Sequence, residues 1–142
     1  MWCCGCGCFK EITQRPEVQA SGFIGKCFVS KKELVLESRP SLQINELRRP
    51  EEAYKSREVG RVAAGTHVKV VRVDQHCEVM GFMILPMVYA HNTTLVRIED
   101  GPFAGKRVGA DQAGISIEPT YLSRDLWKPC EITTTLPASI YD

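Results

Sequence analysis

The sequence predicts a mainly β protein, a small barrel or sandwich, from three observations. Five to seven short apolar segments alternate with turn-forming residues over roughly 95 residues, which is typical of small all-β domains. Eight prolines and 11 glycines are spread along the 142 residues and disfavour long helices. Hydrophobic residues make up 44% and charged residues 25%, as in ordinary globular chains. The length fits one domain.

The first strands are expected at residues 27–29 and 33–37, because both segments are rich in β-forming residues and the turn 30–32 separates them. Residues 38–60 follow as a long irregular excursion, since they contain two prolines and a charged stretch. We therefore expect this excursion to lie outside the core.

The clearest strand covers residues 67–73, where Val68, Val70 and Val73 alternate with polar side chains. Val71 breaks the alternation and predicts a bulge. Residues 94–99 alternate in the same way, and we expect the two strands to be adjacent. Expected core residues from these strands and the loop after them are Val68, Val70, Leu95, Val96 or Ile98, and Phe103.

The remaining segments complete the sheet. Residues 78–90 are expected to be a continuous apolar strand or hairpin. Within them, the run 82–89 is expected to be a central buried strand, in preference to an exposed partner-binding edge. Residues 74–76 and 91–93 are expected to be loops. The sequence 100–102 is a strong turn, and residues 115–117 form a last short strand.

Three regions follow from this pattern. Residues 1–22 are a cysteine-rich N-terminus with a polar linker over 10–19, residues 23–122 are the β-barrel domain, and residues 123–142 are an extended C-terminal tail. Both termini are expected to be flexible.

Charge and composition argue against several functions. The 18 Lys and Arg against 17 Asp and Glu leave a net charge of +1, so nucleic acid is an unlikely main partner. The longest apolar run is shorter than the ~20 residues of a spanning helix. Ligands or bases could come from His67, His76 and His91, but these histidines lack the i, i+4 spacing of a helical metal-binding pair. We therefore expect a non-enzymatic protein without catalytic residues, metal or cofactor.

Four of the seven cysteines lie within the first nine residues. Such a cluster suits lipid attachment, a thiolate metal site or oxidation, and the remaining alternative is a terminus without function. Adjacent and alternating thiols do not readily close a zinc tetrahedron. Cys6 and Cys8 each follow a glycine, which looks like the end of a bacterial lipoprotein signal, so we expect them to be the lipid attachment sites.

Acylation of this kind requires a leader that precedes Met1. Without one, the cysteines would be palmitoylated from the cytosolic side or the domain would be cytoplasmic. In an oxidising compartment, Cys27, Cys77 and Cys130 would form one disulfide and leave one free thiol, with three pairings open. We expect Cys77–Cys130, because it would tie the tail to the barrel. In a reducing cytosol all three would be small hydrophobic residues.

Two segments resemble known families. Residues 60–73, GRVAAGTHVKVVRV, resemble bacterial SH3-like domains. Together with residues 95–108 and the N-terminal cysteines, they resemble small bacterial envelope lipoproteins with one SH3-like barrel. This resemblance implies an SH3-like barrel, a binding or structural role, and membrane anchoring through an acyl group on the periplasmic or extracellular side of the cell envelope. A protein or cell-wall partner is implied without being identified.

The second resemblance concerns residues 96–109, VRIEDGPFAGKRVG, which are similar to the KOW motif of transcription elongation factors and ribosomal proteins. It implies an RNA- or protein-binding loop in a transcription or translation factor. The residues of this loop are Asp100, Gly101, Pro102, Phe103, Lys106 and Arg107. The alternative is a simple hairpin turn, and the near-neutral charge disfavours RNA.

Overall fold

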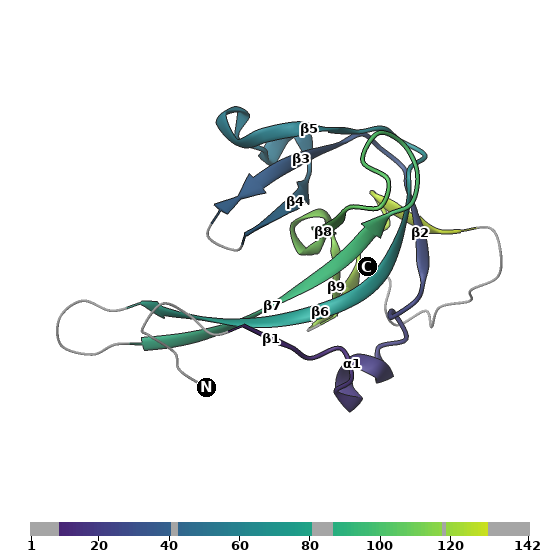
Figure 1. Ribbon diagram of the computed structural model, residues 1–142. Helices are drawn as coiled ribbons and strands as arrows, with labels where there is room; N and C mark the ends of the chain where they lie inside the picture. The colour runs from purple at the N-terminus through teal and green to yellow at the C-terminus, as the bar shows by residue number, and fades with distance from the viewer. Residues whose placement is uncertain (1–8, 41–42, 81–86, 118, 131–142) are drawn as a thin grey trace.

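The computed structural model describes residues 9–40, 43–80, 87–117 and 119–130, and it confirms a mainly β protein (Figure 1). Nine strands form one sheet in the order β11-β2-β6-β7-β8-β4-β3-β5, with β1 paired to β6 beside this path. A second sheet joins β9 and β10. The strands are β1 Phe9–Glu11, β2 Cys27–Ser30, β3 Leu34–Arg39, β4 Ile44–Arg48, β5 Glu58–Val62, β6 His67–Met80, β7 Met87–Ile98, β8 Arg107–Gly109, β9 Ile115–Ile117, β10 Thr120–Leu122 and β11 Trp127–Pro129.

The expected closed barrel is not present in the described residues. Strands β5 and β11 end the path at opposite edges and do not pair with each other. Barrel closure requires strands of compatible length and stagger. Here β6 has 14 residues, whereas β8 has three and contacts β4 through one parallel residue pair, Glu46 with Gly109. These unequal lengths leave an open, curved sheet.

The antiparallel β6–β7 pair dominates the architecture. Its register runs from Val68 opposite Ile98 to Met80 opposite Met87, and it shifts between Val70 and Arg72, which confirms the predicted bulge. We call the part of this pair that projects from the body, residues 74–80 and 87–93, the arm (Figure 1). The segments 74–76 and 91–93 are paired strand and not loops, because polar side chains outside the core are compatible with a continuous ladder. Residues 81–86 of the predicted apolar strand lie outside the described residues.

The predicted core is confirmed for the strand residues. Val68, Val70 and Val96 have no exposed surface, and Leu95 and Ile98 are almost fully buried. Phe103 is only partly buried, at the margin of the core. Phe23, Phe28, Leu36, Leu47 and Trp127 add the largest side chains from other elements.

Residues 10–19 are not the expected linker. The Ile12 amide donates to Val73 O at 2.9 Å, and the Val73 amide donates to Thr13 Oγ1 at 3.1 Å. Ile12 and Val18 are buried, the latter in helix α1, Pro16–Ala20. Two widely spaced apolar side chains are enough to dock this segment, although they leave its composition polar.

The regions 38–60 and 123–130 also differ from expectation. β4 and β5 pair with β3, and only the 3-10 helices η2, Pro50–Glu52, and η3, Lys55–Arg57, resemble an excursion. Trp127 on β11 is buried and its Nε1 donates to Ala113 O at 2.7 Å. The folded domain therefore continues to Cys130, because one large aromatic residue anchors the segment. Residues 131–142 lie outside the described residues.

Candidate functional site

A polar cleft of about 260 Å³ opens at the base of the arm. Strands β3, β4, β6 and β7 and the 3-10 helix η4, Asp111–Ala113, each supply part of its wall. All eight lining side chains carry hydrogen-bonding groups: Arg39, Glu46, His76, His91, Asn92, Thr93, Asp111 and Gln112. We call this cavity the polar cleft.

Asp111 is the most perturbed acid in the polar cleft. Its Oδ2 accepts a hydrogen bond from the Thr94 amide at 2.7 Å, which ties η4 to β7. Burial raises the pKa of Asp111 to about 7, and the nearby Glu46 charge also raises it, whereas hydrogen bonds from Thr94 oppose the rise. At neutral pH both forms of the carboxyl group are therefore populated: the protonated form, which can donate a hydrogen bond, and the ionised form, which only accepts.

The charges around Glu46 are paired. Its Oε1 lies 2.8 Å from Arg39 Nη1 and 2.9 Å from Arg48 Nε. Arg48 Nε also lies 3.3 Å from Oε1 of Glu37, which is fully buried and accepts the Tyr54 amide through Oε2 at 2.9 Å. Two carboxylates and two guanidinium groups thus form a compact network with no net formal charge, and Arg39 and Glu46 of this network line the polar cleft.

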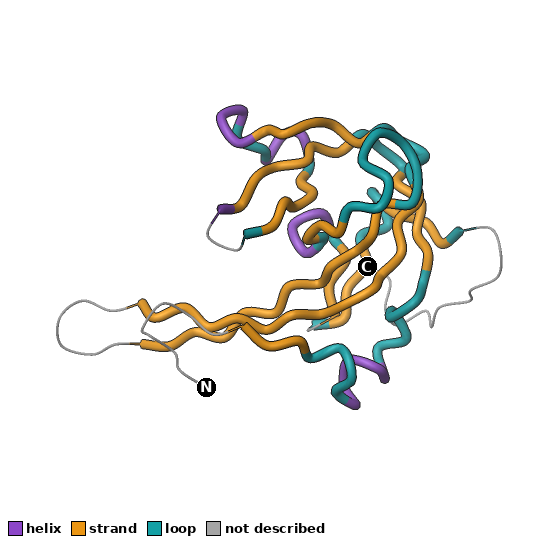
Figure 2. The backbone as a smooth tube through the Cα atoms, viewed as in Figure 1, coloured by secondary structure: helices purple, strands orange, loops and turns teal. Residues whose placement is uncertain are grey.

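Three rings stack at the edge of the polar cleft. The His76 and His91 ring centroids are 5.4 Å apart with planes at 29°, and Phe9 stacks on the other side of His76 at 5.8 Å. The cause is strand register, because His76 is opposite both His91 on β7 and Phe9 on β1. Figure 2 shows these three strands running together into the arm. His76 is buried, whereas Phe9 is 54% exposed.

The sequence named His76 and His91 as candidates without placing them together, and it did not assign the other six lining residues to a common site. Strand register unites the two histidines. Arg39, Glu46, Asp111 and Gln112 come from distant parts of the chain, and no local motif marks them.

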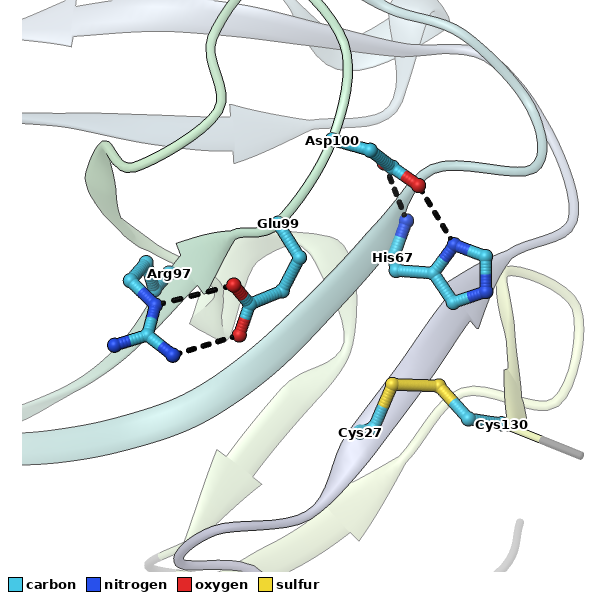
Figure 3. The surroundings of a disulfide bond; sticks show 6 residues. All are labelled: Cys27, His67, Arg97, Glu99, Asp100 and Cys130. Carbon is cyan, nitrogen blue, oxygen red and sulfur yellow. Dashed lines mark hydrogen bonds and ion pairs between the residues drawn. A yellow bond between two sulfur atoms is a disulfide. The ribbon is translucent and has the colours of Figure 1, made fainter. Parts of the chain in front are cut away.

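The disulfide prediction requires correction. Cys130 bonds to Cys27 and not to Cys77 (Figure 3). The antiparallel register of β11 and β2 places Pro129 opposite Phe28, so the next residue outward reaches Cys27. The two Cα atoms are 5.4 Å apart, within the range for a disulfide. Cys77 lies instead on the arm, opposite Ala90.

The predicted binding loop is held by contacts within the domain. Asp100 Oδ1 accepts the His67 amide at 2.9 Å, and Oδ2 lies 2.8 Å from His67 Nδ1 (Figure 3). Phe103 packs so closely on Gly60 that a Cβ there would collide with its ring. Lys106 Nζ lies 5.7 Å from the Phe103 ring centroid. These contacts suit a structural turn.

The remaining loop residues surround this packing. Gly101 and Gly105 adopt positive φ angles that a tight turn requires. Pro102 is exposed between them, and Arg107 begins β8 on the exposed side. Neither the loop nor Arg107 lines the polar cleft. The lipid attachment sites Cys6 and Cys8 lie outside the described residues.

Comparison with known proteins adds no family: no family model, curated protein or solved structure matches this chain. Among the residues that the structure describes, no group of three or more His, Cys, Asp or Glu is placed to hold a metal ion. In the same residues, no helix has the length and apolar character needed to cross a bilayer.

Proposed function

We propose that this chain is a non-enzymatic binding module of the bacterial cell envelope, held at a membrane by acyl groups on its N-terminal cysteines, with the polar cleft as its ligand site. Within this proposal, the open, mainly antiparallel sheet is a divergent relative of the SH3-like domains that residues 60–73 resemble.

The observation that carries the proposal is the Cys27–Cys130 disulfide. Disulfides persist in the periplasm and outside the cell and are rare in the bacterial cytosol. The two cysteines come from β2 and from the residue directly after β11, and they join chain segments 103 residues apart. A bond that closes the folded domain in this way favours an exported protein.

The start of β1 supports membrane attachment. Phe9 already pairs with β6, and Cys8 and Cys6 precede it by one and three residues. Three extended residues span about 10 Å, so an acyl group on either cysteine would hold the domain close to the headgroups. The docked segment 10–19 cannot act as the long spacer that the sequence indicated.

The same geometry favours a particular orientation. β1 is antiparallel to β6, with Glu11 opposite Asp74 and Phe9 opposite His76. The chain direction from Glu11 back to Phe9 therefore points toward the end of the arm. Attachment through Cys6 or Cys8 would place the arm and the adjoining polar cleft on the membrane side of the domain.

The test is fractionation of cells that express the natural full-length protein. We expect it in the membrane fraction with acyl adducts on the N-terminal thiols, and the Cys3, Cys4, Cys6, Cys8→Ser variant in the soluble fraction. Cys77→Ser is the matched control and should remain membrane-bound. A protein that is soluble and carries no acyl adduct would refute the anchor, and free thiols at Cys27 and Cys130 in the freshly isolated, alkylated protein would refute the exported location.

A further inference from the structure

We infer that the polar cleft binds an uncharged, hydroxyl-rich ligand, a saccharide unit, either free or as the headgroup of a lipid. This inference rests on the proposed binding function and names its ligand class.

The lining excludes an apolar ligand. None of the eight side chains is aliphatic, and they include two amides, a hydroxyl, two imidazoles, two carboxyl groups and a guanidinium. Buried polar groups of this kind lose their water only where a ligand supplies hydrogen bonds in return. The volume of about 260 Å³ is that of roughly nine water molecules, which suits a ligand of monosaccharide size.

The paired charges disfavour an ion. Arg39, the one lining guanidinium, already faces Glu46 at 2.8 Å, and Arg48 behind it shares the same carboxylate oxygen. A phosphate or carboxylate ligand would have to compete with Glu46 for Arg39. A metal ion is not favoured either, since the described residues contain no suitable group of three ligands.

A hydroxyl group both donates and accepts, and the polar cleft offers both functions side by side. Asn92 and Gln112 each carry an amide with donor and acceptor atoms. The Asp111 carboxyl group lies on the adjoining wall, where its hydrogen bond with Thr94 fixes it against β7. Asn92 is oriented by Gln75, whose Nε2 lies 3.4 Å from Asn92 Oδ1. These groups stand on paired strands and a short helix, so little ordering is required when a ligand binds.

The ring stack supplies the second element of saccharide recognition. The His91 side chain is exposed and lines the polar cleft, and its ring stacks on that of His76 with the planes at 29°. A sugar ring has one face of C–H groups, and these groups can pack on a flat aromatic surface while its hydroxyl groups reach the amides. The neighbouring Phe9 extends the stack onto β1.

The experiment is NMR titration of the full, disulfide-bonded chain, labelled with ¹⁵N, at neutral pH. The probes are uncharged hexoses, N-acetylhexosamines and their oligomers, inorganic phosphate, Zn²⁺, and phosphatidylcholine vesicles with and without a glucosyl diacylglycerol. We expect an uncharged saccharide to shift the amides of Asn92, Thr93 and Gln112. We expect a Kd of about 1 mM, which is the affinity that roughly four ordinary hydrogen bonds provide.

Gln112→Ala tests the site directly, because Gln112 is exposed and its loss should leave the fold intact. We expect it to weaken saccharide binding roughly three- to tenfold, the change for one hydrogen bond. Gln14→Ala, which removes an exposed amide elsewhere, is the matched control and should bind normally.

The outcomes separate the alternatives. Binding only to glucosyl vesicles supports the inference and identifies a lipid headgroup as the source. If phosphate or Zn²⁺ shifts the same amide resonances and no saccharide does, the ligand class is wrong. If no probe shifts these resonances, the polar cleft is not a binding site for any of them and the inference is overturned. The Gln112→Ala chain should still fractionate with membranes, so failure of this inference is distinguishable from failure of the anchor.

Discussion

Removal of the Cys27–Cys130 disulfide should produce the largest stability loss of any change at the cysteines. The perturbation is the double variant Cys27→Ala, Cys130→Ala. The bond closes a loop with a sequence separation of 103 residues. In the chain-entropy treatment, a loop of about 100 residues contributes about 4.7 kcal/mol at 25 °C, and measured values are typically 2–4 kcal/mol. We therefore expect a loss of about 3–5 kcal/mol.

Urea unfolding at pH 7 measures this loss directly. Trp127 is a suitable fluorescence reporter because it is buried and lies three residues from Cys130, and Trp2→Phe removes the other tryptophan. The same loss should lower Tm by roughly 10–20 °C in a chain of this size. A reductant added to the wild-type protein should reproduce the effect, whereas the double variant should no longer respond to it.

Cys77→Ala is the control for the pairing. It leaves the Cys27–Cys130 bond in place and should keep most of the stability and all of the response to reductant. The reasoning is refuted if Cys77→Ala abolishes the response to reductant, because Cys130 would then pair with Cys77 in solution. It is also refuted if the double variant unfolds at the same urea concentration as the wild type.

Three further predictions concern the polar cleft and the backbone around it. Burial raises the pKa of Asp111 from 3.8 to about 7, so between these pH values the folded state binds a proton that the unfolded state has lost. The free energy of unfolding should therefore fall by on the order of 4 kcal/mol as pH rises from 4 to 7. The urea midpoint of Asp111→Asn should lack this pH dependence, and an unchanged pH dependence would contradict the assignment. Gly114→Ala places a Cβ at a φ of +86° and against the Ser123 side chain, so thermal unfolding should show a loss of more than about 2 kcal/mol in stability. Gly101→Ala has a similar φ but open space around it and should lose about 1 kcal/mol. Arg48→Met should lower the free energy of unfolding by about 3–5 kcal/mol, because it leaves the buried Glu37 carboxylate without its cation. A double variant that adds Glu37→Leu should recover much of that loss. If the losses of the two single variants simply add in the double variant, the pair is not coupled.

Local patterns in the sequence predicted part of the fold. Alternation of apolar and polar residues identified the strands around Val70 and Val96, their adjacency and the bulge at Val71, because side-chain period is a local property. The same reasoning failed at 74–76 and 91–93, where polar residues on an arm outside the core look like loop residues. It also failed at 10–19 and 123–130, where Ile12, Val18 and Trp127 each anchor a segment of polar composition.

The polar cleft could not be predicted, for a different physical reason. Arg39 and Asp111 are brought to one cavity by the path of the sheet, in which β8 lies between β7 and β4. No periodicity encodes that parallel contact between β4 and β8. The disulfide belongs to the same class, since three pairings were compatible with the sequence and only the register of β2 against β11 selects one.

The proposed positions of the anchor and the polar cleft would explain how weak recognition can suffice. Hydrogen bonds to a hydroxyl-rich ligand exchange with water and give only modest net affinity. In the proposed arrangement, Cys8 adjoins Phe9, and Phe9 stacks on His76 at the edge of the polar cleft. A short tether holds two partners at an effective concentration in the millimolar range, comparable to the expected Kd. The polar cleft would therefore be substantially occupied by a saccharide displayed on the same membrane, whereas the same domain released from the membrane would bind it poorly from dilute solution.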